Sequence, residues 1–327
     1  MIMSKKKSGG SAAILAALLA NIGVFIMKLI VGIISGSSSM MAEAIHSFSD
    51  CGNQFALIVG KKIASDKDPD EKHPYGYTMA RYVASLIVAL LLFFIGGLYS
   101  LLSSAGKLRE IVHEGGFVPV DKKGIILSLI VIIAAVIMEA FSFRSGIKEA
   151  KEHREKEELQ ELGLFRFWRE TKASELACVL AEDALAILGL IIAGIGVALT
   201  LVTGNEFFDA LGGTIVGIVI VIGGIFITYK MCLLIIGEAP NKKVLDRILN
   251  IAGSTPGVGR ILNHQITHKS ENFIHICLKI EIPDDENVDD TVIINNIEAE
   301  LYRQLPQYSL QIYIEPDRFD PVLAAKA

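Results

Sequence analysis

Six long, mostly apolar stretches dominate the sequence. They cover residues 11–34, 38–60, 82–104, 125–147, 174–202 and 209–236. A helix needs about 20 such residues to cross the hydrocarbon core of a bilayer. The chain of 327 residues is 52% hydrophobic and 20% charged, which is unusual for a soluble domain. The sequence therefore predicts an α-helical membrane protein with six transmembrane helices.

Lys and Arg are distributed unevenly between the loops. If the amino terminus is cytoplasmic, residues 1–10 and the loops 61–81 and 144–172 together hold 16 basic residues, against four in the loops on the other side. Because cytoplasmic loops carry the excess of Lys and Arg, we expect both termini in the cytoplasm. The first apolar stretch has no convincing cleavage site and is predicted to be retained. We expect an integral multi-pass protein of the cell membrane, either a plasma membrane or an inner membrane.

The composition changes after residue 237. Residues 241–253 have helical spacing, 258–270 and 272–283 alternate like strands, 289–305 are helical again, and 308–316 read as a last strand. This αββαβ order predicts a small ferredoxin-like α+β domain whose helices cover one face of its sheet. We therefore divide the chain into a transmembrane domain, residues 1–237, with a cytoplasmic helical loop at 148–172, and a cytoplasmic domain, residues 238–327.

The second apolar stretch carries a polar stripe. His46 and Asp50 are four residues apart and so lie on one face of a helix, and Glu43 and Asn53 extend that face. Ionisable groups at mid-membrane normally face a protein interior or a water-filled cavity. The stripe therefore needs a polar partner on another helix.

The fifth apolar stretch supplies that partner, because Glu182 and Asp183 stand at its centre. Several acids grouped in a low dielectric need a compensating cation. An imidazole together with carboxylates suits a divalent transition metal, and the histidine favours Zn²⁺, with Mn²⁺, Fe²⁺ and Co²⁺ as alternatives. We predict His46, Asp50, Glu182 and Asp183 as ligands of a transported ion, and no bound cofactor.

Other polar residues in the apolar stretches have simpler explanations. An isolated His–Asp pair can serve as a structural hydrogen bond between helices. Asn21, Lys28 and Glu139 are each interpreted as packing or snorkelling residues rather than as ligands.

Several motifs together resemble the cation diffusion facilitator family. They are HSFSD in the second stretch, DPDEKHPYGYTMARYVASLI entering the third, LAEDALAILG in the fifth, LIIGEAP closing the sixth, and the αββαβ tail. The KHPYGY loop and the Glu–Asp pair resemble its zinc-transporter-9 branch. The resemblance spans nearly the whole chain. It implies a homodimer of six-helix subunits that exports divalent metal in exchange for protons.

One position departs from the family pattern. Many members carry His or Asp four residues before the aspartate of the fifth helix, whereas this chain has Val179 four residues before Asp183. The last ligand is then either Glu182 or the thiol of Cys178, and the Glu–Asp resemblance favours Glu182.

Two further groups are weighed as metal sites. Asp66, Asp68, Asp70 and His73 occupy the loop after the second stretch, where prolines also explain a polar, turn-rich composition. His264, His268 and His275 fall on the two strands predicted at the start of the tail, with His264 and His268 on one face. For both groups we favour surface or core residues over metal ligands.

These features predict a proton-coupled exporter of a divalent metal. An enzyme is not expected, because the HExxH signature of metal-dependent hydrolysis is absent. The alternative function is a membrane-anchored metal sensor or scaffold. Nucleic acid is excluded as a partner, since the net charge is −5 and no basic tract is present.

Overall fold

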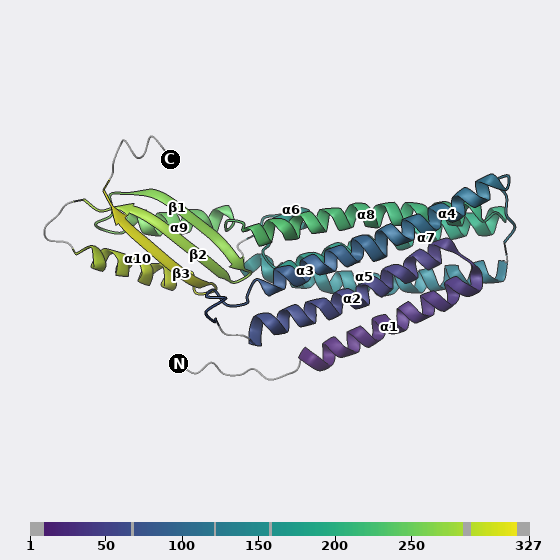
Figure 1. Ribbon diagram of the computed structural model, residues 1–327, viewed down its shortest axis with the longest axis horizontal. Coiled ribbons are helices and arrows are strands. Elements are labelled where there is room, and N and C mark those ends of the chain that lie inside the picture. Colours follow the sequence, from purple (N-terminus) through teal and green to yellow (C-terminus); the bar gives the residue numbers. More distant parts are fainter. Residues whose placement is uncertain (1–9, 67–68, 121, 157–158, 284–288, 319–327) are drawn as a thin grey trace. The chain divides into compact units, whose positions relative to one another are not determined.

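The computed structural model describes residues 10–66, 69–120, 122–156, 159–283 and 289–318, excluding the side chains of residues 10–18, 20, 65, 66 and 156 (Figure 1). The described residues form two compact units. The first contains residues up to 149 together with 175–231, and the second contains residues 150–174 together with those from 232 onward.

The first unit is a bundle of long helices that lie side by side in Figure 1. The third helix is continuous from Ala80 to His113 and changes geometry along its length. The bundle comprises α1 (Gly10–Ser35), α2 (Ser38–Asp66), α3 (Ala80–Leu91), η1 (Leu92–Tyr99), α4 (Ser100–His113), α5 (Lys122–Lys156), α7 (Ser174–Thr203) and α8 (Phe207–Ile236).

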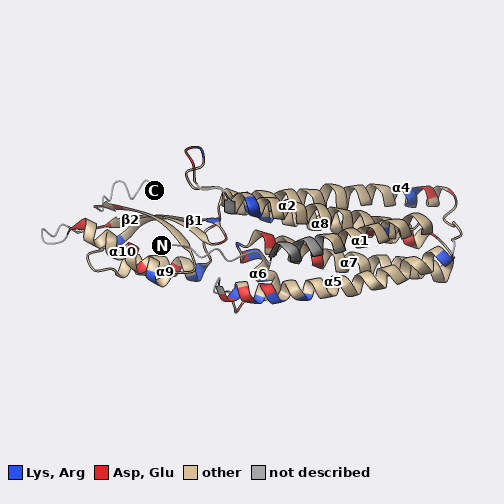
Figure 2. Ribbon diagram, turned by 90° about the horizontal axis from the view of Figure 1, so that it is seen from below, with Lys and Arg blue, Asp and Glu red and all other residues tan. Residues whose placement is uncertain are grey.

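Four helical segments in the described part of the chain are long and apolar enough to cross a membrane. They are Ala80–His113, Lys122–Glu155, Ser174–Thr203 and Phe207–Ile236. Figure 2 shows most of the charged residues of α5 gathered toward its ends, while Glu139 lies at the middle of its sequence. In α1 the apolar segment with described side chains is Asn21–Ser35, which is too short by itself to count as a span. In α2 the polar stripe interrupts the apolar sequence. The chain is a multi-pass membrane protein, with four of the six predicted spans confirmed on this criterion.

The third helix and α8 approach each other to backbone contact. A Cβ atom built on Gly217 would lie 2.6 Å from the Cα atom of Leu101, and one built on Gly224 would lie 2.9 Å from the Cα atom of Phe93. Small residues allow such close packing between membrane helices. Leu92–Tyr99 has π-helical geometry in the middle of this contact, a feature often found at functional sites and one that the sequence did not predict.

The first turn of α2 is fixed by a carboxylate from α8. Asp209 is buried, and its carboxylate accepts hydrogen bonds from the Ser37 hydroxyl at 2.7 Å and from the backbone N–H of Ser38 and of Ser39. An acidic group at a helix amino terminus satisfies unpaired N–H groups and complements the helix dipole. Asp209 therefore fixes where the helix bearing the polar stripe begins.

The second unit contains the predicted αββαβ elements. They are α9 (Lys242–Ser254), β1 (Arg260–Ser270), β2 (Phe273–Glu281), α10 (Asp290–Gln304) and β3 (Ser309–Asp317). The sheet order is β1-β2-β3, with β1 antiparallel and β3 parallel to β2. Alternate residues of β2, such as Ile274 and Ile276, join α9 and α10 in one apolar core. The short helix α6 (Leu164–Glu170) also belongs to this unit.

Substituting Gly217 by Val should destabilise the bundle, because the added side chain meets the backbone of Leu101. Overpacking of this kind costs about 1–3 kcal/mol, so the thermal unfolding temperature of the detergent-solubilised chain should fall. Gly106→Val is the matched control, because a Cβ atom there would have no neighbour within 4 Å. Equal unfolding temperatures for the two variants would contradict the close contact.

Candidate functional site

A buried ion pair joins α1 to α2. The Lys28 ammonium lies 3.3 Å from the Glu43 carboxylate and donates a 2.9 Å hydrogen bond to the Ser47 hydroxyl. Lys28 is only 1% exposed and Glu43 is fully buried. Lys28 therefore does not snorkel toward a membrane surface. It packs inside the bundle, where it compensates part of the negative charge of the stripe.

His46 and Asp50 lie together on the next turns of α2, as their spacing predicted. The Nε2 atom of His46 is 3.8 Å from an Asp50 carboxylate oxygen. His46 is 1% exposed, and within the described structure neither of its ring nitrogens has a hydrogen-bond partner. Buried polar atoms are nearly always satisfied, so an imidazole left in this state is suited to bind a ligand.

The two acids of α7 are each held by a neighbouring helix. Asn53 of α2 donates a 2.7 Å hydrogen bond from Nδ2 to Glu182, and Ser142 of α5 donates a 3.0 Å hydrogen bond to Asp183. The stripe thus meets the Glu–Asp pair through Asn53, as expected of partners across a helix interface.

One cavity of about 140 Å³ connects these groups. Its walls come from α1, α2, α5 and α7, and four carboxylates line it: Asp50, Glu139, Glu182 and Asp183. The neighbouring acids Glu182 and Asp183 both reach this single space. His46 stands beside it, adjacent to Asp50.

The described residues contain no group of three or more His, Cys, Asp or Glu side chains placed to hold an ion together. The structure therefore pairs His46 with Asp50 and brings three predicted ligands to one cavity, but the four-residue site stays a prediction.

Cys178 lies apart from the cavity. Its side chain is fully buried, and its thiol contacts the backbone carbonyl of Ser85 at 3.6 Å. Val179, which stands at the position where many family members have a ligand, does line the cavity. This arrangement favours Glu182 over Cys178 as the last ligand.

Glu139 was underestimated from the sequence. It lines the same cavity as the predicted ligands, although a lone acid in the fourth apolar stretch was interpreted as a packing residue. It stands on α5 one turn before Ser142, which donates to Asp183. This contact between α5 and α7 is visible only in the structure, so the sequence alone carried no signal for it.

Asp70 and His73 form an exposed turn between α2 and α3. The Asp70 carboxylate accepts hydrogen bonds from the backbone N–H of Lys72 and of His73 and from the Tyr77 hydroxyl. The Tyr77 hydrogen bond, followed by the backbone one from His73, lowers the pKa of Asp70. These contacts favour the turn interpretation. Asp68 and the side chain of Asp66 lie outside the described residues.

The tail histidines are separated by the sheet. His268 pairs in register with Ile274 and is buried beside the ring of Tyr308, whereas His275 is paired with Thr267 and lies on the other face beside Tyr313. His264 is exposed on β1. His268 and His275 therefore lie on opposite faces of the sheet, because successive strand residues point to opposite faces, and this agrees with the interpretation of these histidines as core and surface residues.

Comparison with known proteins decides the family. Residues 14–236 match the family model described as the cation efflux transmembrane domain, and residues 240–317 match the one described as the cation efflux protein, cytoplasmic domain. The chain belongs to the cation diffusion facilitator family. It falls in the zinc-transporter-9-like branch, as the loop and the Glu–Asp pair predicted.

Its relatives include proteins of animals, plants and archaea. The "proton-coupled zinc antiporter SLC30A9, mitochondrial" of Xenopus laevis is 28% identical over 280 residues, covering 86% of this chain and 48% of that protein. Metal tolerance protein C4 of Arabidopsis thaliana is 30% identical over 239 residues, covering 72% and 49%. An uncharacterized transporter of Methanocaldococcus jannaschii is 27% identical over 279 residues, covering 83% and 85%. The chain spans about half the length of the first two.

His268 should make the sheet of the second unit sensitive to acid. Burial lowers its pKa from 6.5 to about 4, so the unfolded chain binds the proton more readily. The free energy of unfolding of the sheet is therefore highest above about pH 6.5. It falls by about 3 kcal/mol in total as the pH drops toward 4.

Hydrogen exchange of the β1 and β2 amides in the full chain, corrected for intrinsic rates, should report this loss of protection. His268→Leu should flatten the pH dependence, whereas His264→Leu, at an exposed position on the same strand, should leave it unchanged. An unaltered pH dependence in His268→Leu would show that another group is responsible.

Proposed function

We propose that this chain exports a divalent transition metal, most favourably Zn²⁺, across a membrane in exchange for protons. The observation that carries the proposal is the 140 Å³ cavity inside the helix bundle, lined by four carboxylates and adjacent to an unpartnered imidazole. So many acids inside a membrane domain are costly unless they serve a cation. A structural anchor has no need of them.

The same groups explain coupling to protons. A metal ion requires neutral imidazole and deprotonated carboxylates, so protons and metal compete for one set of atoms. Midplane sites of this kind serve transporters that open alternately to the two sides. The ligands we propose are His46, Asp50, Asp183 and Glu182, with Glu139 close enough to exchange protons or cargo in the same cavity.

The names of the relatives support the finer parts of this proposal. The Xenopus laevis protein is named as a proton-coupled zinc antiporter. The second unit matches a family model whose short name, ZT_dimer, denotes dimerisation, which supports a homodimer. We propose six spans with both termini in the cytoplasm, on the evidence of the basic loops. We propose the cell membrane as the location. The Xenopus laevis relative is named as mitochondrial, so a mitochondrial membrane is the alternative location.

One experiment can test both the choice of metal and the alternative function, a membrane-anchored metal sensor or scaffold. Uptake into proteoliposomes should be compared for Zn²⁺, Mn²⁺, Fe²⁺ and Co²⁺, with the chain ending at residue 240 as a second sample. A metal sensor or scaffold would show no flux with any ion. Flux that survives removal of the cytoplasmic domain would locate transport in the helices.

Replacing His46 or Asp50 by Ala should abolish metal flux driven by a pH gradient, because each loses a ligand of the ion. Flux into proteoliposomes is followed with a metal-sensitive dye. His264→Ala and Asp246→Ala are matched controls, since both residues are exposed in the cytoplasmic domain. Full flux in both His46→Ala and Asp50→Ala would refute the assignment.

A further inference from the structure

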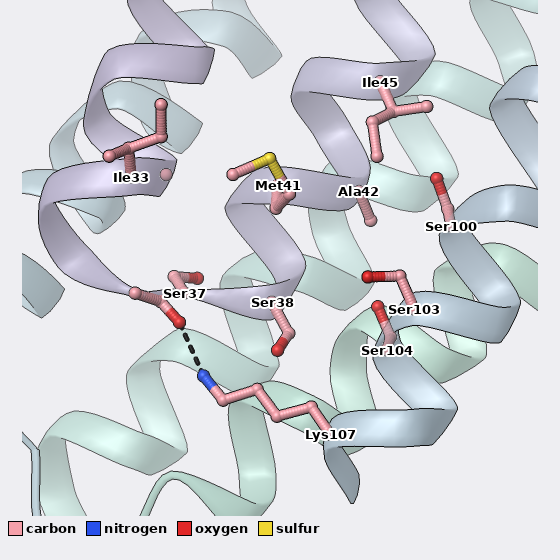
Figure 3. A pocket seen from close by; sticks show the side chains of 12 residues that line it. Ile33, Ser37, Ser38, Met41, Ala42, Ile45, Ser100, Ser103, Ser104 and Lys107 are labelled. Carbon is pink, nitrogen blue, oxygen red and sulfur yellow. Dashed lines mark hydrogen bonds between the residues drawn. The ribbon is translucent and has the colours of Figure 1, made fainter.

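A second pocket lies near the other end of α2, outside the site described above. It holds about 300 Å³ and lies between the α1–α2 turn, α2 and α4 (Figure 3). Five serines line it, together with Lys107: Ser37, Ser38, Ser100, Ser103 and Ser104. Apolar side chains, among them Ala42 and Ile45, complete its walls.

The polar atoms around this pocket are mainly oxygen acceptors. Gly36 turns the chain with a φ of +66°, a conformation that glycine adopts without strain, and its carbonyl accepts a 2.6 Å hydrogen bond from Lys107 (dashed in Figure 3). Glu206 lies beside the same ammonium, 3.2 Å from it. The buried carboxylate of Asp209 holds Ser37. Carbonyl, carboxylate and hydroxyl oxygens can all coordinate a hard cation.

Ser100 marks the inner part of the pocket. It is fully buried, and its hydroxyl has no hydrogen-bond partner in the described structure. Ser103 and Ser104 follow on the next turn of the same helix, toward Lys107, and Figure 3 shows these side chains along one wall. A buried hydroxyl left unsatisfied in a polar pocket is available to water or to an ion.

The pocket approaches the metal-binding region at its inner end. Gly96 lies one helical turn before Ser100, and a Cβ atom built on it would be 3.7 Å from the Nδ1 atom of His46. On α2, Ala42 and Ile45 line the pocket and His46 is the next residue. His46 is therefore adjacent to Ile45 of the pocket on α2 and lies beside Gly96, one turn from Ser100 of the pocket.

The Lys107 ammonium lies among oxygen atoms that could also coordinate a metal cation. Its ammonium contacts the Gly36 carbonyl and the Glu206 carboxylate, and its side chain is 31% exposed. A lysine is a compact positive charge on a flexible stem, so it can leave and return.

We propose that this pocket is a low-affinity release site for the transported divalent cation, and that the Lys107 ammonium competes with the ion for it. The proposal rests on the proposed function. Oxygen ligands alone hold Zn²⁺ less well than a set that includes imidazole. An ion that leaves His46 would thus meet hydroxyl and carbonyl oxygens, and the returning ammonium would displace it to the outside.

Counting bound metal tests the competition without any transport. The full-length chain, purified in detergent, is dialysed against Zn²⁺, and bound zinc is measured for variants of Lys107. Lys107→Met should bind one more ion per chain than the wild type, and Lys107→Arg should not. Arg109→Met is the matched control, because it removes a positive charge from an exposed position of the same helix. Adding Glu206→Gln to Lys107→Met should abolish the extra ion.

Equal zinc content in Lys107→Met and the wild type would overturn the proposal, as would the same gain in Arg109→Met. If Lys107→Met does not fold, Ser103→Cys in a chain that retains Lys107 gives a second measurement. Excess Mn²⁺ should slow alkylation of this thiol by N-ethylmaleimide several-fold, with the wild type as the blank for the native cysteines. Leu102→Cys, at a position that is 65% exposed and outside the pocket, should be unaffected.

Equal protection of the two introduced thiols would also overturn the release site. Both measurements are independent of flux. A chain that binds the extra ion but transports nothing would refute the proposed function and leave the cation site standing. A chain that transports metal but shows neither the extra ion nor the protection would refute the release site and leave the proposed function standing.

Discussion

Membrane helices cannot leave charged groups unpaired, because the bilayer core supplies no water to solvate them. In this chain the constraint is concentrated in α2, whose polar stripe runs from Glu43 to Asn53. The two ends of the stripe are met by other helices: Glu43 by Lys28 of α1, and Asn53 by Glu182 of α7. The groups left without such a partner, above all the His46 ring, stand next to the acidic cavity. The residues that pack the helices together are thus the same ones that form the proposed metal site.

Much of the fold follows from periodicity and composition. The apolar stretches predicted the four confirmed spans, and alternation in the tail predicted the order of α9, β1, β2, α10 and β3. Features that depend on contact between distant segments were not predictable. The approach of Gly217 to Leu101 and the capping of α2 by Asp209 each join residues more than a hundred positions apart. A single sequence carries no signal for such pairs beyond the residue types themselves.

The candidate site was predictable to a similar extent. The spacing of four residues placed His46 beside Asp50, and the rarity of acids in lipid singled out Glu182 and Asp183. The same argument from rarity applied to Glu139 and Lys28, yet both were interpreted as packing or snorkelling residues. A single polar residue on a helix does not indicate which neighbouring helix it faces. The structure supplies that direction: Glu139 lines the cavity, and Lys28 pairs with Glu43. In the tail, the register of β1 against β2 put His268 and His275 on opposite faces.

We propose that the transported ion binds to the imidazole of His46 and to the cavity carboxylates, without sulfur. X-ray absorption at the zinc edge, on the full chain loaded with one equivalent of Zn²⁺, tests it most directly. We expect nitrogen and oxygen ligands at about 2.0–2.2 Å from the zinc, with imidazole scattering that disappears in His46→Ala. A sulfur shell at about 2.3 Å would place the ion on a cysteine such as Cys178 and contradict the account. Imidazole scattering that persists in His46→Ala would contradict it as well.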